Sequence, residues 1–362
     1  MGGGLLQLVA YGAQDVYLSG NPQITFFKVV YRRHTNFSME AIVQTFNGSV
    51  GPNKRVTSQI SRNGDLVHKM YVVFKDVNGA ATGHKALGQH LIKKVEVEIG
   101  GQLIDRQYSE WMYIWNELSL PSGKQTGFES MVNSGSKLYV PLEFWFCRNI
   151  GLALPLIALQ YHEVKLNIDF SGGATSFDAE LWADYIFLDT DERRRFAQLS
   201  HEYLIEQVQH TGSESYNSGS TKQVKLSFNH PVKELVWVLR EDDTKNDVVN
   251  WTSFTDMSMA KLQLNGTDRF AERDGTYFTH VQPYQHHTNI PDSKVNVYSF
   301  GLKPEEHQPS GTLNFSRIDQ SALHITPAAA PATGKNGQIL IYAVNYNVLR
   351  ILSGMGGLAY SN

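Results

Sequence analysis

The two halves of this 362-residue chain carry the same order of short segments, and this internal similarity most constrains the fold. Residues 60–76 match residues 226–242 in their order of Ser, Asn and apolar residues. Three aligned pairs give similar separations: 166 residues for Asn63 and Asn229, 165 for Gly101 and Gly266, and 160 for Ala183 and Ala343. Nearly constant separations with small insertions indicate two copies of one domain.

Most segments of each half have the pattern of β-strands. They are rich in Val, Ile, Tyr and Phe, several alternate apolar with polar residues, and Gly, Asn, Asp or Ser stand at their ends. In the first half the predicted strands are residues 38–46, 54–63, 68–77, 92–101, 137–146, 163–170 and 181–189. A chain with this pattern is predicted to be all-β.

Only two stretches have the spacing or the end signals of a helix. In residues 108–118, apolar side chains recur at helical intervals, at Trp111, Ile114, Trp115 and Leu118. In residues 191–198, Thr190 is a candidate N-cap and acidic residues stand in the first turn, where the helix dipole favours them. We predict a short helix at each place.

Short strands, long connections and a helix between strands favour a jelly roll over an immunoglobulin-like sandwich. We therefore predict two consecutive jelly-roll sandwiches of about eight strands each. The expected boundaries are an N-terminal arm at 1–25, a first jelly roll at 26–198 with a short linker helix at its end, and a second at 199–362. The arm is Gly-rich and then mildly apolar, too loose to form a core by itself.

Composition excludes several classes of protein. The formal net charge is −3, whereas a chain that coats nucleic acid needs an excess of Lys and Arg. The longest apolar run, Ile150 to Leu159, has ten residues and includes Pro155, so it is too short to span a membrane. The N-terminus lacks the pattern of a signal peptide, and Leu6 stands where myristoylation needs Ser or Thr.

The single cysteine, Cys147, cannot form an internal disulfide or a Cys-rich zinc site, which fits folding in a reducing, intracellular place. With His162 it could form a thiol–base pair, but no catalytic signature surrounds it, and lone cysteines usually behave as small buried hydrophobes. His286 and His287 are adjacent, and on a strand they would point to opposite faces. We expect a polar turn or an interface contact there and no metal.

Other tempting clusters also have plain interpretations. Basic residues 31–33 and 193–195 could bind phosphate or anionic lipid, but a solvated face with ion pairs is the expectation. The glycines of 353–357 lack the Lys-Ser/Thr of a phosphate loop and are interpreted as a turn. The acidic stretches 240–243 and 304–307 lack a partner pattern for catalysis. We expect no enzymatic site and no cofactor.

Blocks along the whole chain resemble the major capsid proteins of nucleocytoplasmic large DNA viruses, of the chlorella-virus type. The N-terminal block is LVAYGAQDVYLSGNPQITFFKVVYRRHTNFS, residues 8–38. Further blocks lie, in order, at residues 59–67, 95–105, 151–168, 184–207, 225–231, 263–285, 298–319 and 345–362. Together they cover most of the chain and are more specific than any single motif.

The resemblance implies a double jelly roll and a structural role in the virion. Three chains would form a trimer whose six jelly rolls make a pseudo-hexagonal capsomer, and capsomers would tile an icosahedral shell over an inner membrane. The implied partners are other copies of the chain, minor capsid proteins and that membrane, with no direct binding of nucleic acid. Assembly is expected in the cytoplasm of the host cell.

The connections at 212–221 and 241–256 are short for this family, so the outward surface should be low. A sugar-binding attachment protein or a minor capsid component on the same fold is the alternative, and outer loops could then contact the host. Chlorella-virus relatives carry sugar on surface loops. Five sequons occur, at Asn36, Asn47, Asn250, Asn265 and Asn314, and chance accounts for most. Asn250 and Asn265 are the candidate glycosylation sites.

Overall fold

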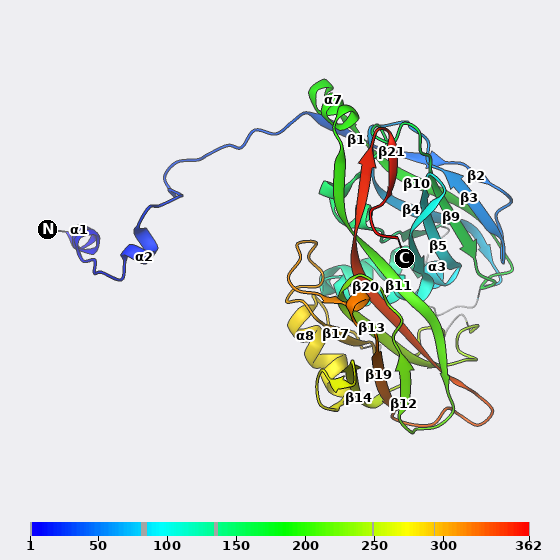
Figure 1. Ribbon diagram of the computed structural model, residues 1–362. Coiled ribbons are helices and arrows are strands. Elements are labelled where there is room, and N and C mark those ends of the chain that lie inside the picture. Colours follow the sequence, from blue (N-terminus) through cyan, green and yellow to red (C-terminus); the bar gives the residue numbers. More distant parts are fainter. Residues whose placement is uncertain (1, 81–84, 134–136, 248–249, 293, 362) are drawn as a thin grey trace. The chain divides into compact units, whose positions relative to one another are not determined.

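The computed structural model describes residues 2–80, 85–133, 137–247, 250–292 and 294–361. The chain divides into two units, Met1–Asn36 and Phe37–Asn362 (Figure 1). In the first unit, α1 (Gly3–Val9) and α2 (Val16–Ser19) are short helices, and neither buries a residue. The sheets lie in the second unit.

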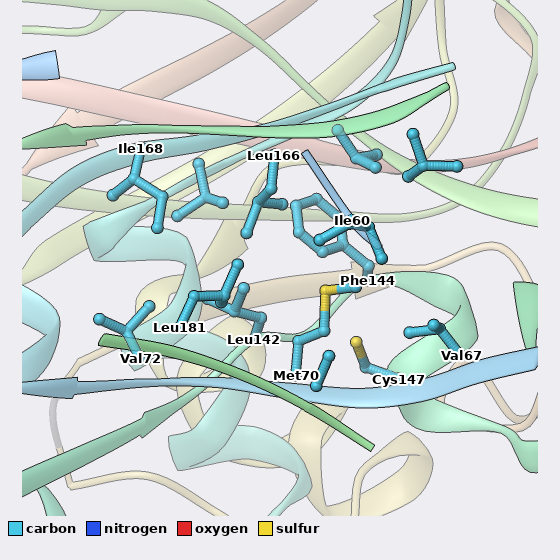
Figure 2. Packing of buried hydrophobic residues seen from close by; sticks show 14 of the residues in the cluster. Ile60, Val67, Met70, Val72, Leu142, Phe144, Cys147, Leu166, Ile168 and Leu181 are labelled. Carbon is cyan, nitrogen blue, oxygen red and sulfur yellow. The ribbon is translucent and has the colours of Figure 1, made fainter. Parts of the chain in front are cut away.

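The first half of that unit is a sandwich of two antiparallel sheets. One sheet has the order β1 (Phe37–Gln44), β10 (Ser176–Leu188), β4 (Leu66–Asn78) and β7 (Lys137–Pro141), with β8 (Leu154–Pro155) also on β4. The other has the order β2 (Phe46–Asn47), β3 (Arg55–Gln59), β9 (Val164–Phe170), β5 (Ile92–Ile99) and β6 (Gln102–Tyr108). Alternate side chains of both sheets meet in an apolar core (Figure 2).

The second half repeats this arrangement. One sheet has the order β11 (His201–Tyr216), β20 (Gly337–Leu352), β13 (Pro231–Glu241) and β17 (Asn296–Ser299), with β18 (Leu313–Asn314) on β13 and β21 (Met355–Leu358) on β20. The other has the order β12 (Lys222–Lys225), β19 (Ser321–Pro327), β14 (Met257–Leu264) and β15 (Thr267–Asp268), with β16 (Arg273–Asp274) on β14.

Both sandwiches join their main strands in one order. Leaving aside the short strands β2, β8, β16, β18 and β21, the eight strands of each half pair as 1-8-3-6 in one sheet and 2-7-4-5 in the other. This is the strand order of a jelly roll, a double-sheet fold built from two Greek keys. The predicted double jelly roll is therefore confirmed.

The repeat extends to the register of single residues. Met70 pairs with Ala183 in the first sandwich, and Leu235 pairs with Ala343 in the second, so the separations are 165 and 160 residues. Just beside these pairs the pairing shifts by one residue in both sandwiches, and it resumes at Val67 with Tyr185 and at Val232 with Asn345. The separation of 166 at Asn63 and Asn229 therefore lies outside the strands, and residues 60–76 align with 226–242 only after a one-residue shift.

Helices fill the connections between strands. In the first half they are α3 (Leu87–His90), α4 (Ser109–Ser119), α5 (Ser122–Asn133), α6 (Trp145–Arg148), η1 (Ile150–Leu152) and α7 (Thr190–Gln198). In the second half they are the π-helical η2 (Tyr277–Val281), α8 (Gln282–His286) and η3 (Phe315–Arg317). Within the described ranges, no helix is long and apolar enough to cross a membrane.

Both predicted helices are confirmed, with one correction. Helix α4 buries Trp111, Ile114, Trp115 and Leu118, the residues whose spacing predicted it. Helix α7 has Asp189 and not Thr190 at its N-cap, because a carboxylate oxygen of Asp189 accepts the amide N–H of Thr190 at 2.7 Å. Helix α5 was not predicted; of its residues only Val132 is buried, so it has almost no apolar periodicity.

The predicted strand at 137–146 is wrong beyond Pro141, where β7 ends. Phe144 caps helix α6, and Trp145, Phe146 and Cys147 follow in it. All four side chains are buried. A strand would turn alternate residues outward, whereas a helical turn entered from the core can bury consecutive ones.

Candidate functional site: the junction of the two sandwiches

The two sandwiches meet at an apolar junction. Helix α4 of the first sandwich packs on the outer face of the sheet β11-β20-β13-β17 of the second, where the Trp111 ring lies 5.4 Å from the Tyr342 ring. Trp251 and Phe254, from the connection between β13 and β14, complete the cover. The remaining buried members of the cluster are Ala86, Tyr113, Ile114, Trp115, Leu118, Val208, Val236, Val238, Val295, Val297, Leu340 and Val344.

Strand alternation explains why one sheet serves two cores. On β13, Leu235, Trp237 and Leu239 face the interior of the second sandwich, while Val236 and Val238 between them face the junction. All five side chains are 0% exposed. A continuous apolar strand of this kind is typical of a sheet covered on both faces. The junction is therefore built like a domain core and fixes one sandwich on the other.

A buried ionic cluster spans the same junction. Glu206 on β11 lies 3.0 Å from the guanidinium of Arg148, which comes from α6 of the first sandwich, and 2.7 Å from the ammonium of Lys233 on β13. Burial by itself would raise the pKa of Glu206, but Arg148, His307 and Lys233 lower it to about 2. The Arg148 guanidinium also lies over the Trp115 ring, 4.7 Å from its centroid. The charges thus hold the sandwiches in one register.

Strand β6 of the first sandwich lies against β11 of the second. Asp105 Oδ1 accepts the amide N–H of Val208 at 3.1 Å, and the Gln207 side chain donates to the carbonyl of Ile104. Burial raises the pKa of Asp105 to about 7. Near its other end the junction has a further ion pair, Arg240 with Glu110 of α4 at 3.0 Å.

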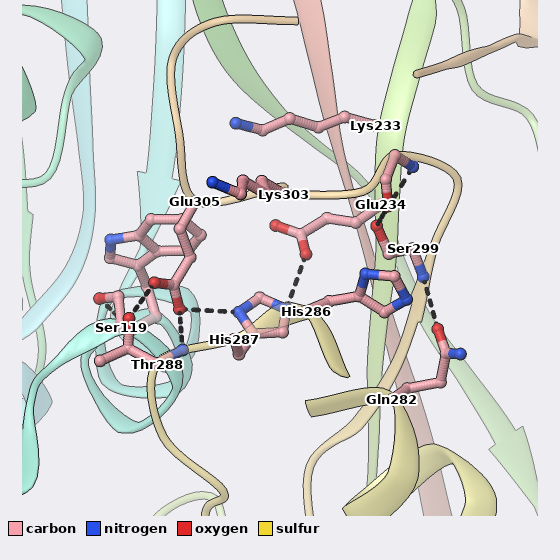
Figure 3. Close-up of polar contacts among 12 residues, drawn as sticks. Ser119, Lys233, Glu234, Gln282, His286, His287, Thr288, Ser299, Lys303 and Glu305 are labelled. Atoms are coloured by element: carbon pink, nitrogen blue, oxygen red, sulfur yellow. Dashed lines mark hydrogen bonds and ion pairs between the residues drawn. The ribbon is translucent and has the colours of Figure 1, made fainter. Parts of the chain in front are cut away.

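His287 is the centre of a second buried charge cluster (Figure 3). Its two ring nitrogens lie 3.0 Å from Glu234 of β13 and 3.0 Å from Glu305, and the His287 side chain is 0% exposed. Burial would lower the pKa of His287, but the two carboxylates raise it to about 9. His286 contacts the carbonyl of Leu302 instead, at 2.9 Å. The pair stands at the end of helix α8 and not on the strand that we considered.

Cys147 and His162 belong to different surroundings. Cys147 lies in the core of the first sandwich beside Met70, and burial raises the pKa of its thiol (Figure 2). The Nδ1 atom of His162 lies 2.9 Å from the carbonyl oxygen and 3.1 Å from the amide nitrogen of Gly356, on β21. Each residue therefore has a structural contact of its own.

The basic cluster at 193–195 makes ion pairs, as expected. Arg193 lies 2.9 Å from Asp65, and Arg195 lies 3.6 Å from Glu192. The glycines of 353–357 form a turn and then strand β21. Among the described residues, no group of three or more His, Cys, Asp or Glu could hold a metal ion.

Both candidate glycosylation sites are on the surface. Asn250 is exposed, and its side-chain amide donates to Asp247 at 2.6 Å. Asn265 is exposed in the turn between β14 and β15, with φ of 49°, and its Oδ1 accepts the amide N–H of Gln320 at 3.1 Å.

Sequence reasoning missed the charged residues of the junction. Lys233 and Glu234 stand inside the otherwise apolar strand β13, and that placement is the one local sign that they are buried with partners. Glu206 and Arg148 have no such sign, because the contact joins residues far apart in the sequence.

Comparisons with known proteins identify the family. A model for the N-terminus of major capsid proteins matches residues 25–189, and a model for large eukaryotic DNA virus major capsid proteins matches residues 192–357. The major capsid protein of Pyramimonas orientalis virus is 54% identical, with all of both chains covered. This chain belongs to the major capsid proteins of large eukaryotic DNA viruses. It is a structural protein of the virion, and it forms part of the capsid.

The major capsid protein of Paramecium bursaria Chlorella virus 1 is 46% identical over all of both chains. A solved structure of VP54 from that virus, PBCV-1, matches this capsid protein with a TM-score of 0.86 and 40% identity, over 93% of this chain and 100% of VP54. The Faustovirus major capsid protein, at 14% identity and a TM-score of 0.78, covers 94% of each chain and shares the fold.

The alignments also show that this capsid protein is compact for its family. The alignment with the Chlorella virus 1 protein has 439 positions, and this chain has 362 residues, so at least 77 positions (439 − 362) hold no residue of this chain. This agrees with the prediction of short loops, although it does not locate them. In the structure, five residues, 217–221, connect β11 to β12.

Proposed function

We propose that three copies of this capsid protein form a capsomer of near six-fold outline, and that such capsomers tile an icosahedral shell. The observation that carries the proposal is the pair of sandwiches with one strand order, fixed to each other by a buried junction. Three-fold symmetry acting on two similar domains gives six similar domains in a ring. A closed ring also prevents growth into fibres.

The proposal includes the surroundings of the shell. The outline of the chain would be an arm at 1–25, a first jelly roll at 26–198 and a second at 199–362, and the boundary between the two family models, at 189–192, supports the second division. The arm would lie on the inner face, near the minor capsid proteins and the inner membrane. Its exposed apolar side chains, such as Leu6, Leu18 and Phe27, support a contact role.

Two absences are also part of the proposal. We infer that the protein performs no catalysis and does not bind the genome directly. Its net charge of −3 supports the second point, because phosphate binding needs an excess of basic residues. Assembly would take place in the host cytoplasm, and the low outer loops would give little surface for host contact.

Asn250 and Asn265 are proposed as sugar attachment sites. Support comes from their exposure, although the side chain of each already has a hydrogen bond. Peptide mass spectrometry of protein from purified virions tests the idea. Peptides with both residues unmodified would remove it.

Electron microscopy and mass photometry of the purified protein test the proposed assembly. A three-chain mass with a hexagonal outline is expected. A protein that remains a single chain at high concentration would contradict the proposal.

A further inference from the structure

The first sandwich has an open apolar row on the outer face of its sheet β1-β10-β4-β7. Val43, Trp182, Tyr71 and Pro141 are paired one after another across the four strands. The Trp182 and Tyr71 rings are stacked, with centroids 6.2 Å apart and planes at 5°. Val43 is 41% exposed, and Tyr139, which packs beside Tyr71, is 38% exposed. We name these five residues the open row.

The second sandwich has the same row, and there it is covered. His210, Tyr342, Val236 and Val297 are paired across β11, β20, β13 and β17, at separations of 167, 160, 165 and 156 residues from the four paired members of the open row. The rings of His210 and Tyr342 are stacked at 4.6 Å. Tyr342 is 1% exposed, because Trp111 of α4 packs on it. The row is thus a face that this fold already uses for contact.

The element that covers the second row also has a counterpart. Helix α4 connects β6 to β7, and η2 with α8 occupies the same place between β15 and β17. Each inserts one side chain into its own sandwich core, Met112 from α4 and Phe278 from η2, 166 residues apart. The same separation pairs Trp111 with Tyr277, Trp115 with Val281, and Leu118 with Tyr284.

The residues paired with the covering face of α4 are open to solvent in a single chain. Val281 is 38% exposed and Tyr284 is 77% exposed. Trp115 and Leu118, in contrast, are 4% and 0% exposed in the junction. The chain therefore has one complete contact of this kind and the two separate halves of another: the open row on the first sandwich and the η2–α8 face on the second.

We propose that Tyr277, Val281 and Tyr284 of one copy pack on the open row of a second copy, as α4 packs on the Tyr342 row within each chain. The inference rests on the proposed self-association and specifies the two faces that meet. The contact is heterologous, since different surfaces of the two copies meet, and three copies close it into a ring. Clustered Trp and Tyr side chains are typical of the centre of a stable interface.

Cross-linking between introduced cysteines tests the contact. The double variant Val43→Cys/Tyr284→Cys places one thiol on each face, and the native Cys147 is buried. A short bis-maleimide should convert this variant into covalent trimers on a denaturing gel. Mixing the two single variants should give covalent dimers. The control Lys165→Cys/Tyr284→Cys, with its first thiol on the other sheet of the sandwich, should remain a single chain.

Charge substitutions give an independent reading. Tyr284→Glu, at a position 77% exposed, should keep the melting temperature of the chain and abolish the trimer in mass photometry. Trp182→Glu should do the same from the other face. Tyr161→Glu, at a position 75% exposed outside both faces, is the matched control and should form trimers.

The possible failures are distinguishable. Trimers that persist in Tyr284→Glu, together with absence of cross-links in the double variant, would overturn this contact and leave the proposed assembly intact. An unmodified protein that never forms trimers would overturn the proposed assembly itself. Cross-links that join this protein only to a different viral protein would show that another partner occupies the open row, and would also overturn the inference.

Discussion

The ammonium of Lys233 lies 2.7 Å from a carboxylate oxygen of Glu206, and the two side chains are only 2% and 6% exposed. Arg148 reaches the same carboxylate from the other sandwich. A buried charge is costly unless it is paired, so the three groups depend on each other. This cluster gives the junction a fixed register that apolar packing alone would not specify.

Removal of the lysine should therefore destabilise the fold. Lys233→Met leaves Glu206 with fewer cations in a buried place, and we expect a loss of about 3 kcal/mol in the free energy of unfolding. Lys303→Met is the matched control, because Lys303 and Glu306 form an exposed pair worth at most about 0.5 kcal/mol. Denaturant titration measures both. Equal effects of the two variants would contradict the role of the buried cluster.

Stability should fall in mild alkali because of His287. Its pKa is about 9 in the folded protein, against an ordinary value of about 6.5. The protonated form is thus favoured by folding, so the contribution is complete below pH 6.5 and is lost as the pH rises through 9. The difference corresponds to about 3 kcal/mol. Unfolding free energies measured between pH 6 and 9.5 should show this decline.

The variants of the two adjacent histidines separate this effect from others. His287→Asn should be less stable at pH 6 and should vary little from pH 6.5 to 9, because Glu234 and Glu305 lose their titrating partner. His286→Asn, which loses only a contact to the carbonyl of Leu302, should keep the decline of the unmodified protein. A decline that survives in His287→Asn would assign it to another group.

Cys147→Ser should assemble normally. The hydroxyl would replace a thiol in an apolar core, and we expect a loss of about 1–2 kcal/mol from its incomplete hydrogen bonding. Denaturant titration measures that loss, and mass photometry should show unchanged trimers. A folded Cys147→Ser protein without trimers would reopen the question of a special role for the thiol.

Deletion of residues 2–25 should separate the capsomer from the shell. The deleted helices α1 and α2 bury no residues, so the melting temperature and the trimer mass should not change. If the arm joins capsomers at their base, electron microscopy at high concentration should show single capsomers and no extended arrays. Normal arrays would remove the proposed role of the arm.

The sequence was informative where local pattern and repetition determine structure. Alternating Val, Ile and Tyr residues predicted strands such as β4 and β9, and helical spacing of two tryptophans predicted α4. The two copies could be aligned because strands of equal role retain similar apolar patterns. The order of strands within each sheet needed the structure, since pairing partners lie far apart along the chain.

The junction was hidden for the same reason. Trp111 and Trp115 were recognised as an apolar face, but no local signal shows that this face covers a different sandwich. Helix α6 was read as strand because Phe144, Trp145 and Phe146 have high strand propensity, and tertiary burial overrode it. The buried His287 looked like part of a polar turn, since its two carboxylate partners lie 53 and 18 residues away.

The one-residue shift in pairing, between β4 and β10 and again between β13 and β20, has a consequence for the history of the chain. A bulge of this kind bends a strand and increases its twist, so each sandwich must accommodate it. Two independent insertions would have no reason to fall at the same rung of both sheets. The bulge therefore dates from a single-sandwich ancestor, whose gene was copied and fused with the irregularity already in place.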